Sequence, residues 1–64
     1  MKPELDRAKI IARLERDGWS TEGGAKHEKF GNAVKLGVKI IVPRHKTLTP
    51  GVARNIAKAA GWRD

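Results

Sequence analysis

The sequence contains no cysteine, and it has no run of apolar residues near the roughly 20 that a membrane-spanning helix needs. Without cysteine the chain can form neither a disulfide nor a thiolate metal site, which suits a reducing compartment. The apolar segment of a signal peptide is also missing. We therefore expect a soluble, cytoplasmic protein that does not bind membranes.

Acidic residues are scarce in the larger, C-terminal part of the chain. Residues 1–22 contain five basic and five acidic side chains, whereas residues 23–64 contain nine basic side chains and only two acidic ones, Glu28 and Asp64. The whole net charge of +7 therefore comes from residues 23–64. A basic surface of this kind indicates binding to nucleic acid or another polyanion, with a merely solubilising surface as the alternative.

Apolar side chains at helical spacing predict a first helix over residues 4–17, with Pro3 before it and Gly18 as its stop signal. A second helix is predicted to begin at Thr49-Pro50, as N-cap and first helical residue, and to end at Gly61. Trp62 is then placed to pack back on the second helix, at Ile56.

Three strands are predicted between the helices, over residues 19–22, 25–30 and 34–42, because apolar residues alternate there with polar ones. Gly23-Gly24 and Gly31-Asn32 are expected to form the turns. We therefore predict one α+β domain over residues 1–64 with the order α-β-β-β-α, in which two helices cover one face of a three-stranded antiparallel sheet.

The period of two within a strand predicts which side chains face solvent. If Phe30 points into the core, His27 and Lys29 point to the open face of the sheet. We expect them to share that face with Lys35 and Lys39 of the next strand.

Several short motifs occur in a characteristic order along the chain. They are Gly18-Trp19, a glycine-rich hairpin, His27 with Phe30 three residues on, Val42-Pro43-Arg44-His45, Pro50-Gly51 and Ala60-Gly61. With these motifs the chain resembles the HicA (YcfA-like) toxins nearly end to end. It departs from the Gly-Ser-His that the family commonly has, because Ala25-Lys26 precede His27. The resemblance implies a fold like that of double-stranded-RNA-binding domains, cleavage of mRNA, and a HicB antitoxin that covers the His27 face.

His27 is the candidate catalytic residue, because an imidazole can transfer a proton near neutral pH. RNA carries its own nucleophile, the 2′-hydroxyl, so its cleavage needs neither a metal nor another cofactor. The basic side chains expected to bind RNA are Lys26, Lys29, Lys35, Lys39, Arg44, His45 and Lys46. We therefore predict a metal-independent endoribonuclease, the toxin of a type II toxin-antitoxin system, with His45 as a second histidine that catalysis does not require.

Other interpretations of the same residues stay open at this point. His27 can be an ordinary exposed histidine of a strand, in a non-catalytic RNA-binding domain of the same fold. A small basic protein associated with DNA or the ribosome is a further alternative, although the chain lacks a helix with basic residues along one face, which major-groove reading requires. The three aromatic side chains are expected in the core rather than stacked on bases.

Overall fold

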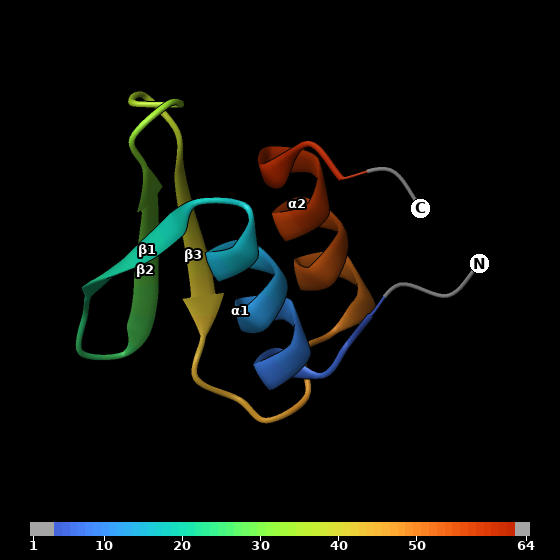
Figure 1. The fold of residues 1–64 in the computed structure, drawn as a ribbon. Helices are drawn as coiled ribbons and strands as arrows, with labels where there is room; N and C mark the ends of the chain where they lie inside the picture. Colours follow the sequence, from blue (N-terminus) through green and yellow to red (C-terminus); the bar gives the residue numbers. More distant parts are fainter. Residues whose placement is uncertain (1–3, 63–64) are drawn as a thin grey trace.

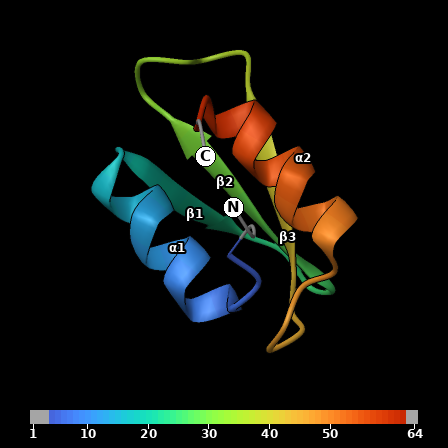
Figure 2. The ribbon, with the colours of Figure 1, turned by 90° about the vertical axis from the view of Figure 1, so that its right-hand side faces the viewer.

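A computed structural model describes residues 4–62, and it contains two helices and three strands in the order α-β-β-β-α. They are α1 (Arg7–Arg16), β1 (Trp19–Gly23), β2 (His27–Asn32), β3 (Lys39–Pro43) and α2 (Pro50–Ala60). The strands form one antiparallel sheet in the order β1-β2-β3, so β2 is its central strand (Figure 1). Both helices cover the same face of this sheet (Figure 2), which confirms the predicted fold.

The core lies between the sheet and the two helices, and every element contributes to it. Its buried side chains are Ile10, Leu14, Trp19, Phe30, Ile40, Val42, Leu48, Ala53, Ile56 and Ala60. Phe30, Leu14 and Val42 are the largest side chains that are fully buried. Phe30 comes from the central strand and lies beside Ile40 of β3 in the pairing register. The orientation of Phe30 therefore decides which residues of β2 face the helices.

The first helix begins later than the predicted range of 4–17. The Asp6 carboxylate accepts hydrogen bonds from two N–H groups of the first turn, so Asp6 is the N-cap of α1. Leu5 instead pairs with the segment that follows β3, where its carbonyl accepts a hydrogen bond of 2.8 Å from the Leu48 N–H. The expected role of Pro3 lies outside the described residues.

The second helix has the predicted ends. The Thr49 hydroxyl accepts a hydrogen bond of 3.3 Å from the Val52 N–H. At the other end Gly61 has a φ of +79°, and the Trp62 N–H donates to the Ala57 carbonyl, as in a Schellman ending. The indole of Trp62 connects the two helices, because its Nε1 donates to Asp17 Oδ2 at 2.7 Å. The expected contact with Ile56 stays a prediction.

The turn expected at Gly31-Asn32 is wrong. Both residues belong to β2, where Gly31 pairs with Lys39 and Asn32 pairs with Trp19. The chain turns only after Asn32, whose side-chain oxygen accepts a hydrogen bond of 2.8 Å from the Val34 N–H. The strand is therefore shifted by two residues along the chain relative to the predicted range.

The third strand is also shorter than the predicted range of 34–42. Residues 33–38 form a loop: the pairing of β2 with β3 ends at Gly31 and Lys39, and the Val38 N–H donates instead to the Lys35 carbonyl at 3.1 Å. Two of their apolar side chains point to solvent, with exposed fractions of 89% for Val34 and 77% for Leu36. The alternation of apolar and polar residues therefore begins before the strand does, and it predicts a strand that is too long.

Truncation of Phe30 tests where the core is centred. Phe30→Ala should lower the free energy of unfolding by about 3–5 kcal/mol, because it removes a fully buried aromatic ring and leaves a cavity. Val34→Ala, at an exposed apolar residue, should change it by less than about 0.5 kcal/mol. Urea unfolding of both variants measures the difference, and equal effects would contradict the described core.

Candidate functional site

His27 is the first residue of the central strand, and it lies opposite Pro43, the last residue of β3. It is exposed, as is Lys29, whereas Phe30 is buried. The predicted orientation of these three residues is therefore confirmed. Among residues 4–62, the His27 imidazole has no hydrogen-bonding or ionic partner. Both of its nitrogens are therefore open to solvent and to a bound molecule.

The turn before His27 depends on the absence of a side chain at Gly24. Gly24 has a φ of +129°, and a Cβ atom there would lie only 2.1 Å from the His27 carbonyl oxygen. Its neighbour Gly23 also has a positive φ, of +86°, but a Cβ atom at Gly23 would meet nothing within 4 Å. The close approach of Gly24 to the backbone of His27 thus sets how the hairpin leads into β2.

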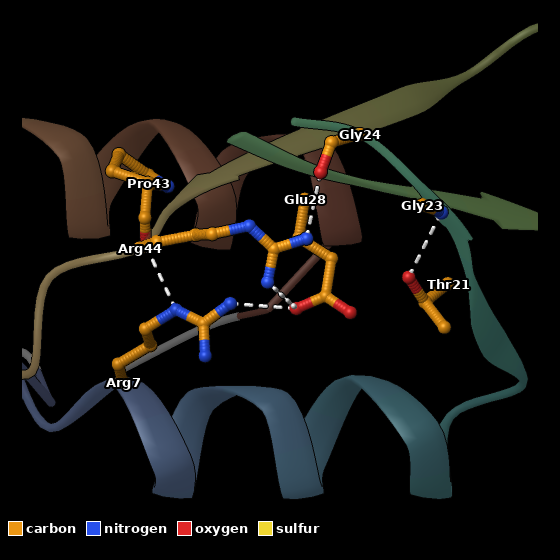
Figure 3. A network of polar contacts seen from close by, with 7 residues as sticks. All are labelled: Arg7, Thr21, Gly23, Gly24, Glu28, Pro43 and Arg44. Atoms are coloured by element: carbon orange, nitrogen blue, oxygen red, sulfur yellow. Dashed lines mark hydrogen bonds and ion pairs between the residues drawn. The ribbon is translucent and has the colours of Figure 1, made fainter. Parts of the chain in front are cut away.

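Glu28 points in the opposite direction from His27, toward the helices. Its side chain is 18% exposed, and its Oε1 lies 2.6 Å from Nη2 of Arg7, the first residue of α1 (Figure 3). The same arginine donates from Nε to the Pro43 carbonyl at 2.8 Å. Arg7 therefore connects the beginning of α1 to both β2 and the end of β3.

Arg44 joins this network from the other side. Its Nη2 donates to the Gly24 carbonyl at 2.8 Å, and its Nη1 lies 4.0 Å from Oε1 of Glu28 (Figure 3). Arg44 therefore links the residue after β3 to the hairpin before His27. Its side chain remains 45% exposed, so it can also face a bound anion.

The surroundings of Glu28 keep its carboxylate ionised. A hydrogen bond from the Thr21 hydroxyl lowers the pKa of Glu28 most, and Arg7 and Arg44 lower it further, while burial opposes them. Because the pKa is lower in the folded chain than in the unfolded one, Glu28 contributes stability at every pH above its pKa in the unfolded chain. That contribution is lost as the pH falls through this value toward the lower folded one.

The structure brings only some of the predicted RNA-binding residues to the His27 end of the sheet. Lys26 is in the hairpin directly before His27, and it is exposed. Lys29 is exposed on the open face, two residues further along β2. Arg44, His45 and Lys46 follow β3 at this same end, and all three are exposed. Among the described residues no hydrogen bond joins the two histidines.

Two predicted residues lie elsewhere. Lys39 is on the open face, but it pairs with Gly31, four residues from His27 along β2, or about 13 Å. Its Nζ lies 2.6 Å from Oε2 of Glu22, so it is already ion-paired. Lys35 was expected on the open face, and this was wrong: it is in the loop before β3, and its Nζ lies 3.5 Å from the Ala60 carbonyl at the end of α2.

The prediction from sequence missed Arg7 and Glu28 as parts of the site. Glu28 is the only acidic residue between Glu22 and Asp64, and it is next to His27. The period of two that places Phe30 in the core also turns Glu28 toward the helices. A part-buried carboxylate needs a cation beside it, so the sequence could have predicted an ion pair for Glu28. It could not have identified Arg7 as the partner.

The described part of the chain holds neither a cluster of metal-ligating side chains nor a helix that could span a membrane. Within residues 4–62, no three His, Asp or Glu side chains gather as a metal site would require. In the same range no helix has both the length and the apolar composition to cross a lipid bilayer.

Together, the fold and the site define a small basic α+β protein with a free histidine at the end of its central strand. A protein-family model described as the HicA toxin of bacterial toxin-antitoxin matches residues 7–62. The match covers most of the 64-residue chain, so the protein belongs to the HicA toxin family. Comparisons with curated proteins and with solved structures give no significant match.

Removal of the Glu28 charge tests the network by its pH dependence. Near pH 7, Glu28→Gln should lower the free energy of unfolding by about 1–2 kcal/mol, since it removes a part-buried, charge-assisted hydrogen bond. The difference from the unmodified protein should shrink as the pH falls below the pKa of Glu28 in the unfolded chain and then through its lower pKa in the folded chain.

Urea unfolding between pH 3 and pH 8 measures both quantities, and Glu22→Gln is the control. Glu22 is in an exposed ion pair with Lys39, so its loss should cost less than about 1 kcal/mol. A Glu28→Gln effect that does not change with pH would contradict a lowered pKa.

Alanine at the two hairpin glycines separates backbone strain from a steric clash. Both Gly23→Ala and Gly24→Ala carry the cost of a positive φ, about 1–2 kcal/mol. Gly24→Ala must also displace the His27 carbonyl, so it should lower stability further and shift the amide NMR signals at the beginning of β2. Equal stability and equal spectra for the two variants would show that the close approach is unimportant.

Proposed function

We propose that this HicA-family toxin is an endoribonuclease that cleaves mRNA without a metal ion, and that His27 transfers the proton. The observation that carries the proposal is the free, exposed imidazole at the end of the central strand, flanked by exposed lysines in a chain of a toxin family. The site of action would be the cytoplasm, where messages are translated.

The chemistry requires little from the protein beyond His27. As a general base, the imidazole would take the proton from a ribose 2′-hydroxyl, whose oxygen attacks the adjacent phosphate to form a 2′,3′-cyclic phosphate. The bond from phosphorus to the 5′-oxygen breaks, and that oxygen takes a proton from solvent water. Lys26 and Lys29 flank His27 in the chain and are exposed, so they are suited to hold the phosphate and to stabilise its developing charge. Arg44 is half-exposed at the same end and can do the same while it holds the hairpin.

The family also implies a protein partner. We propose that an antitoxin of the HicB kind covers the His27 end, where it would block access of RNA to the imidazole. A net charge of +7 favours rapid capture by an acidic partner. The second candidate function is RNA binding without cleavage, which the exposed basic residues support equally and which does not depend on His27.

His27→Ala distinguishes the two functions. The ring is exposed and makes no polar contact within residues 4–62, so stability should change by less than about 0.5 kcal/mol. RNA affinity should change only slightly, because the lysines remain. Cleavage of a purified RNA in EDTA should fall by about 100-fold or more, since a general acid-base group is lost.

His45→Ala is the matched control, because His45 is also exposed and follows β3 at the same end of the sheet. It should retain most of the cleavage activity. Because the two variants are purified in the same way, cleavage by His45→Ala but not by His27→Ala excludes a contaminating nuclease. Full cleavage by His27→Ala would refute the catalytic assignment, and RNA binding by an unmodified protein that never cleaves would favour the second function. Loss of activity in both folded variants would indicate a mechanism with two histidines.

A further inference from the structure

The outer edge of β3 borders an apolar groove. β3 is an edge strand, because its one neighbour in the described sheet is β2. Between this edge and α2 lies a cavity of about 360 Å³. Its walls are four residues of the strand and four of the helix: Lys39, Ile40, Ile41, Pro43, Val52, Asn55, Ile56 and Ala59. The groove thus combines an open strand edge with an apolar floor.

One exposed apolar side chain, Ile41, lines the groove itself. Within residues 4–62, the three large apolar side chains that face solvent are Val34, Leu36 and Ile41, with exposed fractions of 89%, 77% and 45%. Ile41 is on β3, and the other two are in the loop that leads into it. That loop lies at the end of α2, where Lys35 Nζ reaches the Ala60 carbonyl. Ile41 thus adds exposed apolar surface at the strand edge that borders the groove.

The charge around the groove selects the kind of partner. Residues 33–62 include both walls of the groove, and they contain six lysines and arginines but no aspartate or glutamate. A second copy of the chain would bring two such basic edges together, which like-charge repulsion opposes. An RNA strand would suit the charge, but it would leave the apolar floor without an apolar partner. An acidic protein segment satisfies both the charge and the floor.

We propose that β3 binds an extended, acidic segment of a partner protein, which adds to the sheet as a fourth strand. Main-chain hydrogen bonds to the open edge would supply the pairing, as in other cases of strand addition. Successive side chains of a strand point to opposite faces. One set would enter the groove against Val52, Ile56 and Ala59, and the other would lie on the open face beside Lys39. The segment should therefore alternate apolar and acidic residues.

A synthetic peptide of alternating valine and glutamate, about ten residues long, is the probe. In NMR titrations it should shift amide signals of residues 39–43 and 52–59, and it should slow amide exchange in β3. A version with lysine in place of glutamate should bind at least 10-fold more weakly. A version with proline at two adjacent central positions should lose binding, because one of any two successive residues directs its N–H to β3 and proline cannot donate.

Two protein variants place the site. Asn55→Glu puts a carboxylate in the groove at an exposed helical position, and it should weaken binding of the acidic peptide at least 10-fold. Ala12→Glu makes the same change in charge on the exposed side of α1, and it should weaken binding less than 3-fold. Thermal melts of both variants check that they are folded.

Three results would overturn the proposal. The first is the absence of any shift in residues 39–43 and 52–59. The second is equal binding of the acidic and the lysine peptides. The third is an RNA oligonucleotide that shifts the groove residues while the peptide does not, which would make the groove an RNA surface. The peptide titration measures binding alone, so its result does not depend on whether His27 cleaves RNA. The two proposals can therefore fail separately.

Discussion

The carboxylate of Glu28 holds together the segments that surround the candidate site. It faces the helices, where an unpaired charge would be costly, and arginines approach it from two sides. Each guanidinium also has N–H groups that do not face Glu28, and these donate to backbone carbonyls. Arg7 donates to the Pro43 carbonyl, and Arg44 donates to the Gly24 carbonyl. One acidic residue thereby fixes the beginning of α1, the end of β3 and the hairpin relative to one another. The backbone of His27 lies in the middle of this arrangement.

The alternation of side chains along β2 lets one short stretch serve structure and chemistry together. Glu28 and Phe30 face the helices, where one is ion-paired and the other is fully buried. His27 and Lys29 face solvent, and neither has a described partner. The residues that stabilise the strand are thus separate from those that can meet a phosphate. A change at His27 is therefore free of the packing constraints that govern its neighbours.

Local patterns predicted the features that depend on local geometry. The cap at Thr49, the stop at Gly61 and the exposure of His27 all follow from neighbours within a few residues. Failures occurred where a distant segment decides the outcome. Strand β3 begins at Lys39, opposite Gly31, while the Val38 N–H bonds to the Lys35 carbonyl within the loop, and no pattern within residues 34–38 reveals that limit. The ion pair between Arg7 and Glu28 joins residues 21 positions apart, so only the assembled fold brings them together.

The two proposed surfaces share the excess of basic charge but differ in what else they offer. The His27 end offers an imidazole and lysines to a phosphate, whereas the groove beside β3 offers apolar side chains and a strand edge. Strands in a sheet lie about 4.8 Å apart, so a strand added to β3 would lie about 10 Å from β2. Pro43 at the end of β3 is directly opposite His27. A single protein partner bound along β3 would therefore need to extend about 10 Å, or two strand spacings, across the open face to cover the imidazole.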